Sequence, residues 1–483
     1  MTGDFLLDKF QLTVPEPDIY RIGQYRPVSI RDQVIRASFL IERLWTTGRL
    51  KSTSKLLVIG AGAAGVTAAV KAVHFGVTQV RVADVSDRVL SLQAGCTTRW
   101  LDPAQYDWPA SHWDKEVWPV DEPTSFPYPT ATKLSAVVNL EADYADEWSA
   151  NFAFALSVYE SAGSVNFVPG VKVVDWTFST TKACYEVEFD DAATKTSKGS
   201  LDADVIIFAG GFGKELVSVP AWPLGSGTYS SIPFWSDDAF EQPNFGLASL
   251  NLGMLVSGAG DGSLQDFIRL VSGQRSAREV WKAVEPALSP TAHRAFERLV
   301  DWDRNSQDAE QFAPAYGSMC ERLAALHARY QAEVQRLRGS VAEWAAVAAA
   351  LDALIPTARP TDKVFLALKS AHFDGCYSLN RLVTLLLIEY VQHKHPGHFP
   401  VFVGVGIRGV VPTYTLPTGG TAILVVVALS TTCETTAAEI ANWPGQGGAR
   451  PFDGIVIRHG IDTTALSVKS AKLAPQVVPS HLP

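Results

Sequence analysis

The sequence Leu-Leu-Val-Ile-Gly-Ala-Gly-Ala-Ala-Gly at residues 56–65 decides the fold of this chain. Its four leading apolar residues predict a buried strand, and the glycine-spaced run after them predicts a tight turn that opens a helix. In a turn of this kind Gly60 permits the change of direction, Gly62 lets the backbone approach a pyrophosphate, and Gly65 lets the helix lie close to the strand. The stretch therefore predicts the first half of a nucleotide-binding unit.

The residues after the turn complete this unit. The helix begins at Ala63 and Ala64, and its first N–H groups and positive dipole end would face the phosphates. A second apolar run at residues 80–83 ends in Asp84, at the spacing where an acid accepts a hydrogen bond from a ribose hydroxyl. Strand, turn, helix, strand and acid in this order predict a dinucleotide site, and the alternative is a glycine-rich turn that binds nothing.

Composition and charge limit the function of the chain. With 483 residues, of which 47% are hydrophobic and 19% charged, it is long enough for two or three folded domains. A formal net charge of -9 argues against a general nucleic-acid binder or a membrane-surface binder. The apolar runs are too short to cross a bilayer as helices, and the first residues lack the basic-then-apolar pattern of a signal peptide.

The cysteines and histidines predict neither a metal site nor a dithiol site. Five scattered cysteines without a Cys-x-x-Cys pair fit a reducing cytoplasm, which is where we expect this protein. His393, His395 and His398 lie in a loop with Lys, Pro and Gly and no nearby thiol, so we interpret them as solvated. The motifs of acyl transfer, zinc proteolysis and phosphoryl transfer are absent from the sequence.

Residues 88–113 concentrate aromatic, arginine, histidine and acidic side chains. In one interpretation this loop lines the cofactor, with Arg88, Arg99 and Trp100 in contact with it. In the other, its tryptophans are core anchors, and Arg99 forms a local ion pair with Asp102. The tryptophans concerned are Trp100, Trp108, Trp113 and Trp118.

A resemblance to a known superfamily extends over residues 57–213. The glycine turn and Asp84 are followed by two alternating apolar runs, which predict an antiparallel meander, and then by Asp-Val-Ile-Ile-Phe-Ala-Gly-Gly at residues 204–211. This order resembles the flavoproteins with two dinucleotide-binding domains, which include glutathione and thioredoxin reductases, flavin-containing monooxygenases and N-hydroxylating monooxygenases. The resemblance implies an FAD domain with a β-meander.

The resemblance also implies particular cofactor contacts. In those flavoproteins FAD binds at the first glycine turn, and the strand that ends in Gly210 and Gly211 returns beneath it. Two positions depart from the pattern: Gly210 stands where the relatives have threonine, and Asp84 stands where FAD-binding relatives usually have glutamate.

A second glycine turn follows a Pro- and Ser-rich connection. Gly258, Gly260 and Ser263 match by position the turn that receives NAD(P)H in thioredoxin-reductase-like proteins. The strand and acid that should come next are missing, because residues 277–362 carry the period of helices. The alternative is a turn that binds no phosphate, or one whose Asp261 faces the flavin or the substrate.

We expect an α/β fold in which a Rossmann-type FAD domain precedes a second, Rossmann-like α/β domain with a helical insertion. Apolar runs at residues 401–406, 422–429 and 454–457 predict strands of the second domain that are buried on both faces. Residues 29–50 predict a helix that starts near Ser29 or Asp32 and packs on the first unit. The expected boundaries are 1–55 for an N-terminal arm and packing helix, 56–250 for the FAD domain, 251–276 with 363–483 for the second domain, and 277–362 for the insertion.

The sequence thus predicts an FAD-dependent oxidoreductase with a small-molecule substrate between the two α/β units, near residues 99–113. We expect NAD(P)H as the electron donor, and a monooxygenase is one form of such an enzyme. His372, Arg458 and His459 follow predicted strands and are the candidate catalytic residues, against the simpler interpretation of polar strand ends. The alternatives are an amine or amino-acid oxidase or dehydrogenase, and a non-catalytic FAD- or NAD-binding sensor.

Overall fold

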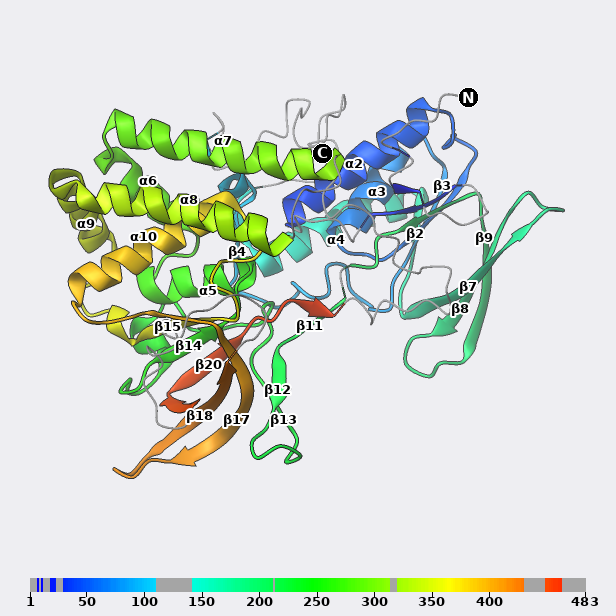
Figure 1. The fold of residues 1–483 in the computed structure, drawn as a ribbon. Coiled ribbons are helices and arrows are strands. Elements are labelled where there is room, and N and C mark those ends of the chain that lie inside the picture. Colours follow the sequence, from blue (N-terminus) through cyan, green and yellow to red (C-terminus); the bar gives the residue numbers. More distant parts are fainter. Residues whose placement is uncertain are drawn as a thin grey trace.

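The computed structural model describes residues 7, 10–11, 18–22, 29–109, 141–211, 213–312, 319–429 and 448–462. These residues form two units, each built on a parallel sheet with helices on one face and an antiparallel sheet on the other (Figure 1). The fold class is therefore α/β, as the sequence predicts.

The first parallel sheet has the strand order β1–β10–β2–β3–β6. The bounds of these strands are Ile19–Arg21, Val205–Phe208, Lys55–Ile59, Gln79–Ala83 and Val165–Val168. The apolar run at residues 56–59 falls in β2, the middle strand, which is why it is covered on both faces. The edge strand β1 comes from the predicted N-terminal arm, where three residues are too short for a periodic signal.

Helices and a β-meander cover the two faces of this sheet. The helices are α2 (Ile30–Thr46), α3 (Ala63–His74) and α4 (Ala145–Ser161). The meander is β7 (Val171–Ser179), β8 (Cys184–Asp191) and β9 (Ser197–Ala203). Its antiparallel pairing is confirmed, and Trp176 packs with Leu57 and Ile206 of the sheet in one buried cluster. The hydroxyl of Ser29 accepts a hydrogen bond from the backbone N–H of Asp32, so the predicted start of α2 is also confirmed.

The second parallel sheet has the strand order β16–β15–β14–β20. The bounds of these strands are Val401–Val403, Val364–Leu368, Met254–Ser257 and Gly454–Ile457. Its helices are α5 (Asp261–Ser272), α6 (Ala277–Val284), α7 (Pro290–Phe312), α8 (Met319–Gly339), α9 (Val341–Leu354) and α10 (Ser378–Lys394). Five of these, α5 to α9, stand in the chain between β14 and β15, and the last four fall in the segment predicted to be a helical insertion. They form the helical side of the molecule, at the upper left of Figure 1.

Two predicted strands are placed differently in the structure. The run at residues 401–406 is divided: Val401–Val403 form β16, an edge strand of the parallel sheet, and a separate antiparallel strand begins at Val405. The run at residues 422–429 is not part of the buried parallel sheet but of β18 (Thr421–Leu429), which pairs antiparallel with β17 (Val405–Thr415) and β19 (Ala449–Phe452). Gly419 and Gly420 both have positive φ and form the hairpin turn that reverses the chain before β18. The prediction of burial on both faces is therefore wrong, because an apolar run alone does not distinguish a buried parallel strand from a hairpin strand.

Short elements complete the described chain. They are β4 (Trp100–Leu101), η1 (Pro103–Tyr106), β5 (Asp143–Tyr144), β11 (Lys214–Glu215), β12 (Ser218–Pro220), β13 (Thr228–Ser230), η3 (Pro243–Gly246), η4 (Glu285–Ala287), η5 (Thr361–Lys363) and β21 (Ile461–Asp462). Among the helices in the described ranges, none combines the length and the apolar character needed to cross a bilayer.

Candidate functional site

The first glycine turn joins β2 to α3 at the carboxyl edge of the first sheet. Gly60 has a φ of +109°, and a Cβ at this position would lie 2.4 Å from the carbonyl oxygen of Ala209, the residue after β10. A Cβ at Gly65 would lie 1.8 Å from the oxygen of Gly60. Both positions therefore require glycine, the first for its backbone conformation and the second for the close approach of helix and turn.

Gly62 differs from its two neighbours because nothing lies within 4 Å of the place where its Cβ would be. It is the N-cap of α3, and no side chain caps the helix there. The N–H groups at Ala63 and Ala64 thus stand at an uncapped helix N-terminus beside open space. A pyrophosphate is the group that such a site accommodates, since it accepts several N–H bonds and complements the positive end of the helix dipole.

Asp84 follows β3 and faces the same turn. One carboxylate oxygen accepts a hydrogen bond from the N–H of Ala61 at 2.6 Å, and the other accepts one from the N–H of Ser86 at 2.7 Å. These two bonds fix the orientation of the carboxylate, and each oxygen keeps a second lone pair for a further donor. The position fits the ribose contact that the sequence predicts for this acid.

Three further predicted cofactor residues of the first unit are exposed near the turn or on the segment after Asp84. Gly210 and Gly211 are exposed after β10, and the Cα of Gly210 is 2.9 Å from the place where a Cβ of Gly60 would be. The strand that ends in glycines thus borders the turn. Arg88 is exposed on the segment after Asp84, and its backbone N–H bonds to Ser86 Oγ.

Arg99 is placed between the units, at a buried group of charges. Its guanidinium pairs with Asp266 of α5 and lies 3.0 Å from a carboxylate oxygen of Asp238, and it is 4.2 Å from the ring centre of Phe234. The predicted local pair of Arg99 with Asp102 is therefore wrong: Asp102 pairs with Arg278 of α6 at 2.9 Å. Each arginine finds its partner across the unit boundary, which sequence proximity cannot reveal.

Arg458, one of the candidate catalytic residues, belongs to the same group of charges. Its Nε is 2.9 Å from Asp266, and its Nη1 donates to the carbonyl of Ile232 at 2.6 Å. Burial alone would raise the pKa of Asp266, but the guanidiniums of Arg99 and Arg458 outweigh burial and hold this pKa below its usual value. The structure thus places Arg458 on a buried carboxylate rather than in an open cleft.

The two candidate histidines both follow predicted strands, but they differ in their exposure to solvent. His372 is 3% exposed, and its Nδ1 lies 3.0 Å from the carbonyl oxygen of Phe373. His459 is exposed, and its Nε2 is 2.8 Å from Ser257 Oγ at the end of β14. Desolvation of the ring and the charge of Lys369 lower the pKa of His459. Of the two, only His459 is open to solvent at a strand end.

The second glycine turn joins β14 to α5. A Cβ at Gly258 would lie 2.2 Å from the carbonyl oxygen of Arg458, while one at Gly260 would meet nothing within 4 Å. Ser263 is fully buried and donates its hydroxyl hydrogen to the carbonyl of Gly260 at 2.6 Å. Asp261, the first residue of α5, accepts hydrogen bonds of 2.9 Å from the backbone N–H of Tyr377 and from Asn380 Nδ2.

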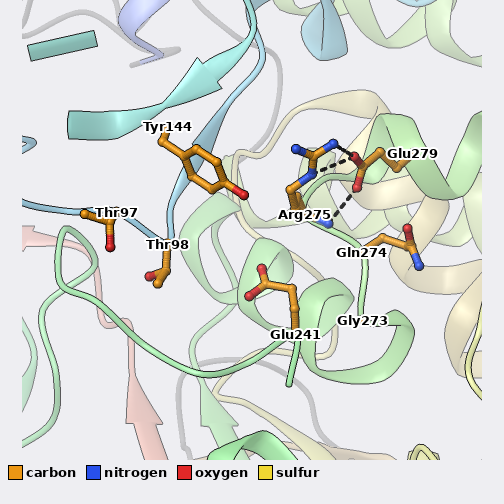
Figure 2. A pocket seen from close by; sticks show the side chains of 8 residues that line it. All are labelled: Thr97, Thr98, Tyr144, Glu241, Gly273, Gln274, Arg275 and Glu279. Carbon is orange, nitrogen blue, oxygen red and sulfur yellow. Dashed lines mark hydrogen bonds and ion pairs between the residues drawn. The ribbon is translucent and has the colours of Figure 1, made fainter. Parts of the chain in front are cut away.

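A cleft of about 400 Å³ opens between the two units (Figure 2). Its lining residues come from the first unit, from the connection and from the α5–α6 region. They are Thr97, Thr98, Tyr144, Glu241, Gly273, Gln274, Arg275 and Glu279. Figure 2 shows the hydroxyl of Tyr144 directed toward the neighbouring Arg275. Polar groups of both signs therefore surround the space.

Arg275 is held in this cleft by two contacts. Its Nε and Nη2 donate to Glu279 at 2.9 and 2.5 Å, and its guanidinium lies 3.9 Å from the ring centre of Trp100. Trp100 packs edge-on against Tyr144, with ring centres 5.1 Å apart. Of the aromatic residues predicted to line a site, Trp100 thus borders the cleft, whereas Trp108 is buried against Trp281 as a core anchor.

Other sequence predictions fall outside this region. His112, Trp113 and Trp118 lie outside the described residues. His393 packs on Trp344, and His395 Nε2 lies 2.9 Å from Thr361 Oγ1. The cleft residues Tyr144, Glu241, Arg275 and Glu279 were missed by sequence reasoning, because they are polar residues at helix and strand ends without a motif. Among the residues near the cleft, only Trp100 belonged to a sequence feature that predicted a site, the aromatic-rich loop.

No family model matches the chain, and no curated protein matches it. Among solved structures, an open form of cyclohexanone monooxygenase is similar at 15% identity and a TM-score of 0.37, over 85% of this chain and 74% of that one.

Two further structures give similar values, also over 85% of this chain. The FAD-bound cadaverine monooxygenase of desferrioxamine biosynthesis from Erwinia amylovora has 12% identity and a TM-score of 0.36 over 78% of its length. L-lysine 6-monooxygenase from Pseudomonas syringae has 13% identity and a TM-score of 0.32 over 81% of its length. Similarities of this size decide nothing about the activity of this chain.

Proposed function

We propose that this protein is an FAD-dependent oxidoreductase that acts on a small molecule. The observation that carries the proposal is the open space at Gly62, which adjoins the uncapped N-terminus of α3 and the carboxylate of Asp84. Phosphate-binding amides and a ribose acceptor at one sheet edge are what an adenine dinucleotide requires. The identity of the dinucleotide as FAD rests on the resemblance of residues 57–213.

The residues of the chain would have separate tasks in holding this cofactor. The turn at Gly60 and Gly62 and the amides at Ala63 and Ala64 would bind the pyrophosphate, and Asp84 would accept a ribose hydroxyl. Bound FAD supplies the capacity to take up or release two electrons. The chain supplies orientation and a site from which water is excluded.

The cleft of Figure 2 is the proposed location of the substrate. It lies between the units, beside Trp100, which supports the proposal. Tyr144 could donate its hydroxyl hydrogen to a substrate. The charges of the lining are paired within the protein, Arg275 with Glu279 and Glu241 with Arg269, and each charged group keeps further sites for a hydrogen bond to a substrate. These groups suit a small polar molecule better than an apolar one.

Two forms of the reaction remain to be separated by experiment. An NAD(P)H-using enzyme, such as a monooxygenase, requires a nicotinamide site in addition to the FAD site. An oxidase or dehydrogenase for an amine or amino acid does not, because its substrate supplies the electrons. The hydrogen bonds between Asp261 and the start of α10 favour the second form, since they occupy the region where a nicotinamide dinucleotide would approach.

The decisive experiment measures flavin in the purified full-length protein. We expect close to one FAD per chain in the wild type and loss of FAD in Gly62→Val, whose side chain would fill the open space. Gly260→Val, at the matching position of the second turn, is the control and should keep its flavin. A wild-type protein that takes up no FAD even in excess would overturn the proposal. Anaerobic titration with NADH, NADPH and amine substrates then identifies the electron donor.

A further inference from the structure

We infer that Asp261 closes the second glycine turn to nicotinamide dinucleotides, so that NAD(P)H does not bind there. This inference concerns the electron donor. It bears on the reaction only if the protein is the FAD enzyme proposed above, so it rests on that proposed function. The observations that carry it are the hydrogen bonds, the charge and the covering segments at this turn.

The backbone of the second turn is not the obstacle. Gly258 has a positive φ of 145° and packs against Arg458, as Gly60 packs against Ala209 in the first turn. Gly260 is the N-cap of α5 without a side-chain cap and has open space at its Cβ position, as Gly62 does in α3. Two turns of the same shape therefore differ in the side chains beside them.

The first helical residue is the main difference between the two turns. It is Ala63 in α3 and Asp261 in α5. A pyrophosphate at a helix N-terminus lies against this first turn and carries negative charge. A carboxylate at the same place repels it, and the repulsion is strong where water is scarce.

Hydrogen bonds hold the Asp261 carboxylate in this place. Its Oδ1 accepts from the N–H of Tyr377, the N-cap of α10, and from Asn380 in the first turn of α10. Burial raises the pKa of Asp261 to about 6, so the group still carries its charge at neutral pH and above. The carboxylate therefore serves as the internal anion for the start of α10.

The segment before α10 adds cover to the turn. The N–H of Asp374 donates to the carbonyl of Ala259 at 2.9 Å, inside the turn itself. The ring of Tyr377 lies 4.0 Å from that of Tyr106, and its hydroxyl bonds to Asp32 at the start of α2. A dinucleotide could enter only if contacts with both units were broken.

The neighbouring strand also lacks the ribose acceptor. β15 pairs with β14 and ends at Leu368, and the next residue is Lys369. In nicotinamide sites that bind NAD, an acid stands at the end of the strand beside the turn. Asp84 fills this place in the first unit, and the second unit has Lys369 there, so the acceptor for the ribose of NADH is missing. A basic residue can receive the 2′-phosphate of NADPH, so the case against NADPH rests on the Asp261 carboxylate and the covering segment.

Direct binding to the FAD-loaded full-length protein tests the inference. The probes are NADPH and ADP-ribose, which carries the pyrophosphate without the nicotinamide, and calorimetry gives their dissociation constants. We expect no saturable binding to the wild type and binding tighter by about tenfold or more in Asp261→Ala, which reproduces Ala63. Adding Gly260→Val should abolish the gain.

Two results would overturn this inference, and a third would support it. Saturable wild-type binding that Gly260→Val removes would overturn it, and so would a folded Asp261→Ala variant with no gain. Wild-type binding that survives Gly260→Val comes from another site and supports a closed turn. If Asp261→Ala does not fold, Asp261→Asn takes its place with the same expected gain, because an amide oxygen can still accept from Tyr377. Flavin content, measured separately, reports on the proposed function alone.

Discussion

Arg99 of the first unit and Asp266 of α5 form a buried ion pair that joins the two halves of the molecule. Both side chains are nearly inaccessible to solvent, and Asp266 also pairs with Arg458 and, at 3.6 Å, with Arg269, so one carboxylate faces three guanidiniums. The cleft of Figure 2 lies between the same units, and Thr98, the residue before Arg99, is one of its lining residues. The ion pair therefore fixes the walls of the proposed substrate site.

Asp266→Asn should destabilise the protein by about 3–5 kcal/mol, because it removes the buried counter-charge of Arg458 and one of the two carboxylates that pair with Arg99. The free energy of unfolding from urea titration measures this loss. Asp202→Asn is the control: Asp202 is a third exposed and pairs with Lys182, so its loss should cost less than about 1 kcal/mol. Equal losses in the two variants would show that the inter-unit pair is not a structural link.

Gly65→Ala should lower the stability of the apoprotein by about 1–3 kcal/mol, because its Cβ would meet the oxygen of Gly60 at 1.8 Å and the helix must move. Gly62→Ala should leave the apoprotein almost unchanged, since its Cβ enters open space. Thermal unfolding of flavin-free protein measures both. A loss of stability in Gly62→Ala as large as that in Gly65→Ala would mean that the space at Gly62 is filled.

Asp84→Asn should weaken FAD binding by about tenfold or more, because a hydrogen bond to a charged acceptor contributes about 1.5–3 kcal/mol. The dissociation constant of FAD from fluorescence titration of the apoprotein measures this change. Asp204→Asn is a matched control from the same sheet: Asp204 accepts from the N–H of Lys55 at the opposite end of β2. Its FAD affinity should match that of the wild type, and a parallel loss would remove Asp84 from the site.

Asp261→Asn should stabilise the protein at alkaline pH. Because the pKa of Asp261 is raised to about 6 in the fold, against about 3.9 in an unfolded chain, the folded state prefers the protonated acid. The carboxylate thus costs stability that grows as the pH rises from about 4 to about 6 and then stays constant, at about 2–3 kcal/mol. Urea unfolding should show the variant more stable at pH 8 and equal to the wild type near pH 4, so a constant difference over this range would contradict the raised pKa.

Local sequence was sufficient to predict the elements whose conformation depends on residues close by in the chain. The first turn was predictable because a positive φ at Gly60 and the close approach of Gly65 to the oxygen of Gly60 are conditions of the local backbone. The start of α2 at Ser29 was predictable for the same reason, since a capping side chain bonds to a backbone group three residues away. By contrast, the apolar run of β18 looked like a buried parallel strand, because its partner strands are determined by a hairpin and not by the run itself.

The sequence by itself determined that the chain has two glycine turns, each between a strand and a helix. Only the tertiary structure decided what adjoins each turn: at the first, the carboxylate of Asp84 bonds to the turn backbone, whereas at the second the carboxylate of Asp261 is tied to α10. It also decided the partners of Arg99 and Arg458 and the walls of the cleft. These contacts join residues far apart in the chain. The sequence shows that a side chain is charged or can form hydrogen bonds, but it does not show which residue will be its partner.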